Sequence, residues 1–488
     1  MIRADMGPES LRPAERYGLE VLIDLSRLLP VEQAEGDLVR LTVVERPSAG
    51  SAAADLSSQA ALERADGEVR VSRAALRAVT EVAGGALEQR STRSDRHGRT
   101  PSAENPLVAA GQSRRPIVSL LAQELRRAVL AVAGRRPVRM VAPWPEGHRW
   151  AALLTHDLDV VDWWAFFPLL RMVELARKGS WDRLSQVGRG LRRNAGRDPV
   201  SRGVHSILQL EAHHGIRGTW FVICAGPTLR SFLAGDSTYR AQGPAARRIL
   251  AALLQAGHEI GLHGSFATGA DARRMASERR ALARLTDAPV LGVRQHFLRM
   301  RPGETQRHMV TSGFEYDATW GFADRNGFRL GVADLVPAWD AEKEQTLPLE
   351  VVPLTWMDRA LSKYAGVEEP GRWIEDAREL ARECKAVEGA WSGLWHPNTM
   401  EALGFPGAEP AFVSLLQAMA DDRPYFGSAH KLVQWRRFRR SIRARRVSAD
   451  GRVALSTAGG QRTVIALEDE SGDTTQVQIQ ASRSGGAA

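Results

Sequence analysis

One apolar run of this chain ends abruptly on acidic residues. Residues 150–159 read WAALLTHDLD, so the run ends on Asp157 and Asp159, with His156 between the apolar residues and the first acid. A buried strand that carries carboxylates at its end is how α/β enzymes present acids to a metal ion and a substrate. Aspartate is also common in turns and helix caps, so the pair alone leaves both interpretations open.

Three later apolar runs end in a similar way. They are GHEIGLHGS at 257–265, GVRQHFL at 292–298 and WSGLWHPN at 391–398. Amphipathic segments with helical periodicity, such as 245–256 and 276–285, alternate with the apolar runs. This alternation predicts repeated β-α units and therefore an α/β fold, in which polar residues just past the parallel strands meet at one mouth.

The order of these motifs resembles the polysaccharide deacetylases of the NodB-homology type, also called carbohydrate esterase family 4. The resemblance covers roughly residues 149–399 and implies a distorted (β/α)7 barrel, which agrees with a count of about seven apolar runs. It is carried, in chain order, by Thr155-His156-Asp157-Leu158-Asp159, His258-Glu259-Ile260-Gly261-Leu262-His263, Arg294-Gln295-His296, Tyr316-Asp317-Ala318-Thr319-Trp320 and Leu394-Trp395-His396.

This resemblance implies a metal-dependent hydrolase that removes an N-acetyl group from a carbohydrate by means of metal-activated water. Asp159 and His263 match the family's metal ligands, and the divalent ion is expected to be Zn²⁺, with Co²⁺, Mn²⁺ and Ni²⁺ as alternatives. Asp157 matches the general base, and His396 matches the general acid that protonates the leaving amine. Arg294 matches the arginine that orients the base and keeps it ionised.

The metal motif departs from the family's pattern at one position. The family places a second histidine four residues after the first, where this chain has Ala267. His296 is the predicted replacement, because it follows a different strand but is expected to point toward the same mouth. Two alternatives stay open: Ser265 and Thr268 contribute oxygen ligands, or Arg294 alone is functional and His296 only lines the cleft.

Asp317 and Trp320 match the fourth motif of the family. The resemblance implies that they bind substrate, with Asp317 helping to position the catalytic histidine and Trp320 forming an apolar wall for the acetyl methyl group. The same residues also fit an ordinary strand, because they are good β formers.

The length of 488 residues predicts more than one domain. We expect an N-terminal α/β accessory region at 1–140, the barrel at 141–440 and a small β-rich extension at 441–488, which ends in a disordered tail. No segment resembles a signal peptide or is long and apolar enough to span a membrane, so a cytoplasmic location is expected.

The composition bears on the partners. The net charge of +9 is small beside 66 basic and 57 acidic residues, and no zinc-finger or RNP-like motif accompanies the basic runs, so a carbohydrate rather than a nucleic acid is expected as the partner. Residues 162–184 predict an amphipathic helix near the mouth, which either packs on the barrel or contacts a sugar or a lipid-linked glycan at a membrane. The sequence does not predict the oligomeric state.

Two other functions compete with deacetylation of a carbohydrate. One is hydrolysis of a C–N bond in a small molecule, since loops set the size of the pocket. The other is carbohydrate binding without catalysis, which Ala267 favours because it leaves the metal site incomplete. A binding protein would not need an acid and a base together, so Asp157 and His396 favour the hydrolase.

Overall fold

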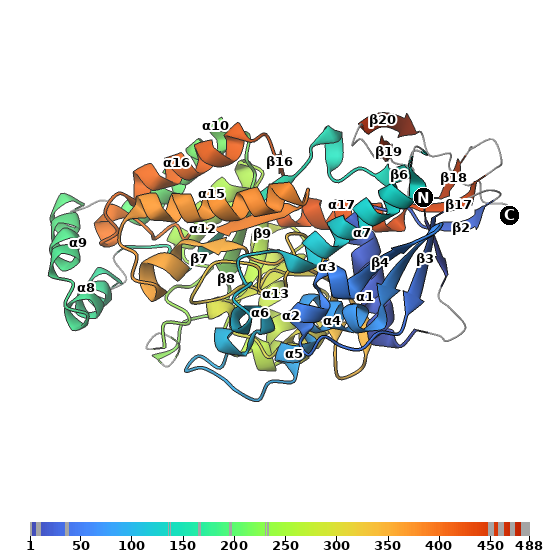
Figure 1. Cartoon of the computed structure of the whole chain (residues 1–488). Coiled ribbons are helices and arrows are strands. Elements are labelled where there is room, and N and C mark those ends of the chain that lie inside the picture. The colour runs from blue at the N-terminus through green and yellow to red at the C-terminus, as the bar shows by residue number, and fades with distance from the viewer. Residues whose placement is uncertain are drawn as a thin grey trace.

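The computed structural model describes residues 2–5, 11–34, 39–134, 136, 138–163, 167–194, 198–229, 231, 234–447, 453–456, 463–468 and 474–479. A curled ten-stranded sheet forms the centre, flanked by helices, and a four-stranded sheet lies at the N-terminal end (Figure 1). Within the described residues, no helix combines the length and the apolar character needed to cross a membrane.

The strands of the central sheet follow the order β12-β13-β11-β10-β9-β8-β7-β15-β14, and β16 pairs with β7. All pairs are parallel except β12 with β13. In chain order the strands are β7 (Ala151–Leu158), β8 (Thr219–Ile223), β9 (Glu259–Gly264), β10 (Gly292–Gln295), β11 (Tyr316–Asp317), β12 (Val336–Asp340), β13 (Gln345–Val351), β14 (Trp356–Met357), β15 (Ala390–Leu394) and β16 (Tyr425–Phe426).

The pairing explains the continuous apolar run at the first motif. β7 pairs with β8 and with β15, and all eight of its residues are buried. A parallel strand covered on both faces reads as an unbroken apolar segment rather than an alternating one. The chain therefore becomes accessible only past the end of this strand, at Asp159.

The expected strands and helices of the central region are present. The run at 218–224 forms β8, the segment at 245–256 forms α12 (Pro244–Gln255), and Gly257 after that helix has a positive φ of 77°. β12, β14 and β16 were not predicted. The described strands do not close into a ring, since β12 and β14 end the sheet, so the seven-unit barrel stays a prediction.

Helices cover the central sheet and connect its strands. The α-helices are α8 (Phe167–Arg177), α9 (Trp181–Arg193), α10 (Pro199–His213), α12, α13 (Ala272–Thr286), α14 (Glu304–Thr311), α15 (Pro370–Ala386), α16 (Ala408–Asp421) and α17 (Ala429–Ser441). Short helical turns are η2 (Pro145–Gly147), η3 (Thr268–Ala270), η4 (His296–Leu298), η5 (Ala360–Tyr364) and η6 (Glu401–Leu403).

The long connection after β7 contains α8, α9 and α10, and the described part of the predicted amphipathic segment falls in two helices, α8 and α9, instead of one. α8 and α9 lie at one end of the molecule (Figure 1). Arg171 of α8 donates to the carbonyl of Leu403, and Arg183 of α9 donates to the carbonyl of Gly404 at 2.7 Å. These bonds fix the helix pair against the loop that follows β15.

The N-terminal region forms its own sheet, ordered β1-β3-β5-β4, with helices packed on it. Its elements are β1 (Ile2–Asp5), α1 (Pro13–Ser26), β2 (Val31–Ala34), β3 (Val39–Val44), α2 (Ala52–Asp55), α3 (Ser58–Ala61), β4 (Leu62–Ala65), β5 (Glu68–Ser72), α4 (Arg73–Ala83), α5 (Ala86–Gln89), η1 (Ser102–Glu104), α6 (Pro106–Ala109), α7 (Ile117–Ala133) and β6 (Val138–Val141). The predicted helix at 117–133 is α7.

The N-terminal region and the central sheet share one hydrophobic core. The Tyr17 hydroxyl of α1 donates to the carbonyl of Pro337 in β12 at 2.8 Å. Glu388, before β15, pairs with Arg27 and with Arg126, each at 2.6 Å. The charge of Glu388 is thus compensated by two N-terminal arginines across this contact.

The described C-terminal strands pair with N-terminal strands, so the separate β-rich extension stays a prediction. β17 (Arg443–Val447) and β18 (Val453–Ser456) continue from β2, and β19 (Thr463–Glu468) and β20 (Thr474–Ile479) continue from β6. Figure 1 shows them beside the N-terminal region. The predicted disordered tail lies outside the described residues.

Gly292 offers a test of the packing that positions β10. A Cβ at this position would lie 1.8 Å from the ring of Tyr316, whose hydroxyl is held by Glu259 at 2.7 Å. We predict that Gly292→Ala destabilises the protein by about 1–3 kcal/mol, because an overpacked core must distort. The control is Gly188→Ala in α9, where an added Cβ has no other atom within 4 Å, so this variant should be neutral or stabilising. Thermal unfolding of both variants measures the difference. Equal melting temperatures for both variants would contradict the packing at β10.

Candidate metal and catalytic site

The carboxyl ends of the parallel strands bring the predicted site residues to one side of the sheet. Asp159 follows β7, His263 lies near the end of β9, His296 follows β10 and His396 comes two residues after β15. Side chains two positions apart share a face of a strand, which places Thr155, Asp157 and Asp159 together. His156 lies on the opposite face, where Nδ1 donates to the Trp395 carbonyl and Nε2 contacts Glu211 at 3.0 Å.

Arg294 joins the strands at the base of this site. Its Nη1 donates to Asp157 Oδ1 and to Thr155 Oγ1, both at 2.9 Å, and its Nε donates to the Ala318 carbonyl at 2.9 Å. The guanidinium also lies over the ring of Phe221, 4.4 Å from its centroid. The arginine is fully buried, so Asp157 provides the compensating carboxylate and is held in one orientation.

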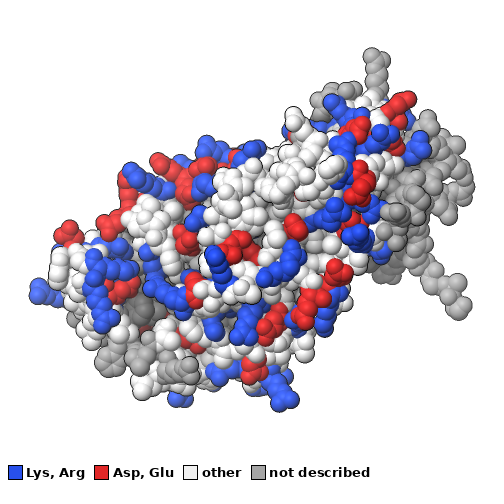
Figure 2. All heavy atoms as spheres, turned by 60° about the horizontal axis from the view of Figure 1, so that its bottom comes forward, with Lys and Arg blue, Asp and Glu red and all other residues white. Residues whose placement is uncertain are grey.

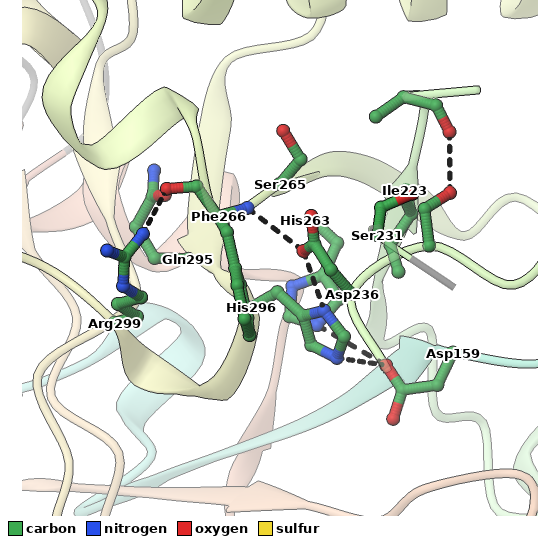
Figure 3. A network of polar contacts seen from close by, with 12 residues as sticks. Asp159, Ile223, Ser231, Asp236, His263, Ser265, Phe266, Gln295, His296 and Arg299 are labelled. Atoms are coloured by element: carbon green, nitrogen blue, oxygen red, sulfur yellow. Dashed lines mark hydrogen bonds and ion pairs between the residues drawn. The ribbon is translucent and has the colours of Figure 1, made fainter. Parts of the chain in front are cut away.

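Asp159, His263 and His296 form a compact group of possible metal ligands. One ligand atom from each lies within 4.8 Å of the others. Asp159 Oδ1 is 3.4 Å from His263 Nε2 and 3.5 Å from His296 Nε2 (Figure 3). Zinc ligands about 2.0–2.1 Å from the ion at tetrahedral angles would be about 3.3–3.4 Å apart, which matches the two separations from Asp159 Oδ1.

The hydrogen bonds around this group leave two candidate ligand atoms, Asp159 Oδ1 and His263 Nε2, without a partner. Nδ1 of His263 donates to the Arg294 carbonyl at 2.9 Å, which leaves the lone pair on Nε2. Asp159 Oδ1 and His263 Nε2 are both buried and lack any hydrogen-bond partner. Buried polar atoms without a partner are rare, and two that face each other fit a shared cation.

The charges within this group also shift the pKa values. Burial alone would raise the pKa of Asp159, but the imidazoles of His263, His296 and His396 outweigh it and hold that pKa well below its ordinary value. Burial would lower the pKa of His263, but Asp157 and Asp159 raise it above its ordinary value. The two carboxylates therefore favour a positive charge at this place, from a proton or from a metal ion.

The family's second histidine would stand at Ala267, and the polar residues near this position make other contacts. Ala267 precedes η3 and is not among the possible ligands. The Ser265 hydroxyl donates to Glu278 at 2.6 Å and the Thr268 hydroxyl donates to Gln295 at 2.8 Å, so both are engaged elsewhere. Of the candidates open from the sequence, His296 is the one that groups with Asp159 and His263.

Two carboxylates that the sequence did not single out hold the histidines of the site. Asp236 lies 3.4 Å from His296 Nδ1, on the side away from Asp159 (Figure 3). Asp358, directly after β14, accepts from His396 Nδ1 at 2.6 Å and from the His396 backbone N–H at 3.2 Å. The bond to Asp358 directs His396 Nε2 toward Asp159 Oδ2, which is 3.9 Å away.

Asp317 and Trp320 lie behind the site. Asp317 accepts from the Thr319 backbone N–H at 2.8 Å, and burial raises its pKa to about 6. Trp320 is buried in the shared core against Gly85. Neither residue lines the cavity over the metal ligands, and Asp358 rather than Asp317 holds His396. A contact of Asp317 or Trp320 with substrate remains a prediction.

A cavity of about 300 Å³ lies directly over these residues. Asp157, Asp159, His263, His296 and His396 line its floor. Its walls come from α8, from α9, from the loop after β14 and from Arg99 of the N-terminal region. Its volume is at the lower end for small-molecule sites.

Comparison with solved structures identifies several neighbours at low identity. A protein from Mycobacterium smegmatis assigned as a polysaccharide deacetylase is 21% identical, with 60% of this chain and 92% of that chain covered and a TM-score of 0.41. One from Pseudomonas aeruginosa PAO1 is 16% identical, with 60% and 93% covered and a TM-score of 0.39. A carbohydrate esterase family 4 pseudoenzyme from Bacillus anthracis is 10% identical, with 58% and 65% covered and a TM-score of 0.30.

No protein-family model matches the sequence, and no curated protein matches it. What this chain can do chemically must therefore follow from its own side chains.

The metal group predicts the effect of removing single ligands. His263→Gln and His296→Gln should each weaken zinc binding by more than about a hundredfold, because even an outer hydrogen-bond partner is worth about ten- to a hundredfold. The exposed His205 on α10 is the matched control, and His205→Gln should bind zinc normally. Metal content after dialysis against zinc measures this. Full zinc binding by His296→Gln would show that His296 is not a ligand.

The raised pKa of His263 predicts how zinc binding depends on pH. The metal must displace the proton from this imidazole, so affinity should fall as pH decreases through that pKa, by about tenfold per unit for each proton displaced. Because the pKa lies above its ordinary value, the decline should begin at a higher pH than for an exposed histidine. Titration calorimetry in buffers of different ionisation enthalpy would measure the released proton. Affinity independent of pH between 8 and 6 would contradict this.

Proposed function

We propose that this protein is a metal-dependent hydrolase that removes an N-acetyl group from a carbohydrate. The observation that supports this most directly is the convergence of Asp157, Asp159, His263, His296 and His396 on the floor of one cavity. A metal triad with a separate carboxylate and a separate imidazole supplies the Lewis acid, the base and the acid for one established route to hydrolysis of an amide.

Asp159, His263 and His296 would hold a divalent cation, for which zinc fits the mixed oxygen and nitrogen ligands. When bound, such an ion polarises the acyl carbonyl and makes water acidic enough to react at neutral pH.

Asp157 is placed to act as the general base. Its Oδ1 is held by Arg294 at 2.9 Å, and its Oδ2 lies 3.5 Å from His263 Nε2, beside the metal group. The arginine fixes the orientation of the carboxylate, which can accept a proton from water as the water attacks the acetyl carbonyl.

His396 is placed to act as the general acid. The Asp358 carboxylate accepts the proton on Nδ1, so Nε2 is the ring nitrogen that faces the cavity floor. His396 can thus donate a proton to the amine nitrogen as the C–N bond breaks.

An apolar part of the cavity wall suits the acetyl methyl group. Leu298, Met357 and Leu394 pack together in one cluster and line the cavity. In this proposal these three side chains, and not Trp320, form the apolar wall that contacts the acetyl methyl group.

Three further features belong to this proposal. We regard the curled central sheet as an incomplete version of the predicted barrel. Leu169, Leu170 and Val173 of α8 are exposed, and Leu170 lines the cavity, so contact with a lipid-linked glycan fits the surface.

A small-molecule C–N hydrolase is the second candidate, and the cavity volume of about 300 Å³ favours it over a long polymer.

Substitution of the base and the acid tests the proposal. Asp157→Asn and His396→Gln should each lower kcat for acetate release from N-acetylated oligosaccharides by about 10²- to 10⁴-fold. Both variants should keep their zinc, because neither residue belongs to the metal group. His205→Gln again serves as the control and should keep full activity. Acetate release by Asp157→Asn at the normal rate would refute the assignment, and the absence of acetate from every saccharide tested would refute the deacetylase.

A further inference from the structure

The cavity wall beyond the metal ligands is rich in cations. Its acidic residues are Asp157 and Asp159 on the floor and Glu174 on α8. The cationic residues that line it are Arg99, Arg171, Lys178, Arg183, Arg359 and Lys363. Basic side chains are also visible at the end of the molecule where α8 and α9 lie (Figure 2). The outer part of the cavity therefore carries more positive charge than negative charge.

Three of these guanidinium groups surround one aromatic ring. Arg359, Arg171 and Arg183 lie 4.4, 4.7 and 5.0 Å from the centroid of Phe405. The ring offers each a favourable cation-π contact, but the three like charges also repel one another. Such a cluster needs negative charge nearby.

Within the described part of the chain, carboxylates pair with two of these three guanidinium groups. Glu174 pairs with Arg171 at 2.7 Å, and Glu368 lies 3.4 Å from Arg183. Arg359 donates from Nη2 to the amide oxygen of Asn398 at 2.8 Å. Among the described residues, no carboxylate lies within 4 Å of the Arg359 guanidinium or of the Lys363 ammonium.

The surroundings of Arg359 show the same imbalance. Burial lowers its pKa, the neighbouring Asp358 partly offsets this, and the like charge of Arg171 lowers the pKa further. An anion bound here would replace lost hydration with a charge-assisted hydrogen bond, which is a strong form of hydrogen bond in proteins.

Arg359 has a fixed position relative to the catalytic groups. It directly follows Asp358, which holds His396, and its partner Asn398 comes two residues after His396. An anion held by Arg359 would therefore lie at a defined place relative to the general acid. Lys363, one turn further along in η5, lines the same wall.

We propose that the cavity binds an N-acetylated saccharide that carries an anionic group, a phosphate or a carboxylate, and that Arg359 and Lys363 hold this group. The acetyl end of this substrate rests on the proposed function, whereas binding of the anion does not. The cavity volume of about 300 Å³ favours a short saccharide.

Equilibrium binding tests the proposal independently of turnover. The zinc-loaded protein with Asp157→Asn would be titrated with three probes, namely methyl N-acetylglucosaminide, N-acetylglucosamine 1-phosphate and N-acetylmuramic acid. We expect the anionic probes to bind about ten- to a hundredfold more tightly than the neutral one, as a charged hydrogen bond provides. If both anionic probes bind tightly, the site takes either anion; if only one does, that probe identifies the anion.

Variants then assign the preference to the two cations. Arg359→Gln and Lys363→Met should each bring the dissociation constants of the neutral and the anionic probes closer together. Lys363 is exposed, so its variant should fold even if the Arg359 variant does not. The control is Arg372→Gln, an exposed arginine of α15 outside the cavity wall, which should keep the full preference.

Equal binding of neutral and anionic probes would overturn the proposal, as would a preference that survives both substitutions or is equally lost in Arg372→Gln. If the anionic probes bind as expected but no saccharide yields acetate in the unmodified protein, the anion site stands and the deacetylase fails.

Discussion

The buried contact between Arg294 and Asp157 sets the geometry on which the rest of the site depends. Arg294 lies on β10 and Asp157 on β7, three strands apart in the sheet. In a flat sheet that offset would be about 14 Å, given strands about 4.8 Å apart. Nη1 nevertheless lies 2.9 Å from Oδ1, because the sheet curls and the long side chain crosses its concave face. The same curl brings His263 and His296 toward Asp159.

In the proposed metal site, His296 would take the place of the family's second histidine. Ala267 lies in the loop after β9, where the family pattern has its histidine, and the imidazole of His296 comes from the neighbouring strand β10. Adjacent parallel strands end close together, so a ligand can move from one strand to the next without moving the ion. The Asp236 carboxylate beside His296 Nδ1 favours the orientation in which Nε2 faces Asp159.

Much of the site could be predicted from the sequence because its residues follow long apolar strands. Asp159, His263 and His396 were recognisable in this way. Asp358 was not, because β14 has only two residues, Trp356 and Met357, and two apolar residues give no periodicity. Asp236 does not directly follow any of the described strands. Arg359 gives no signal in the sequence, since its lack of a carboxylate partner depends on contacts between distant segments.

The fold shows the same division. α7 and α12 were predicted nearly to the residue from their helical periodicity. The N-terminal region was expected to be α/β, but β4 and β5 were not predicted, since they are short and carry mixed polar and apolar residues. The pairing of the C-terminal strands with β2 and β6 could not be predicted, because strand partners far apart in sequence are set by the tertiary fold.

X-ray absorption spectroscopy of the zinc-loaded protein would test the central claim most directly. A cation held by Asp159, His263 and His296 predicts one zinc per chain with a first shell of oxygen and nitrogen only, and outer scattering from two imidazole rings. The His296→Gln variant should lose one of these rings or lose the zinc. A sulfur ligand, scattering from a single imidazole in the unmodified protein, or two imidazoles retained in His296→Gln would contradict the account.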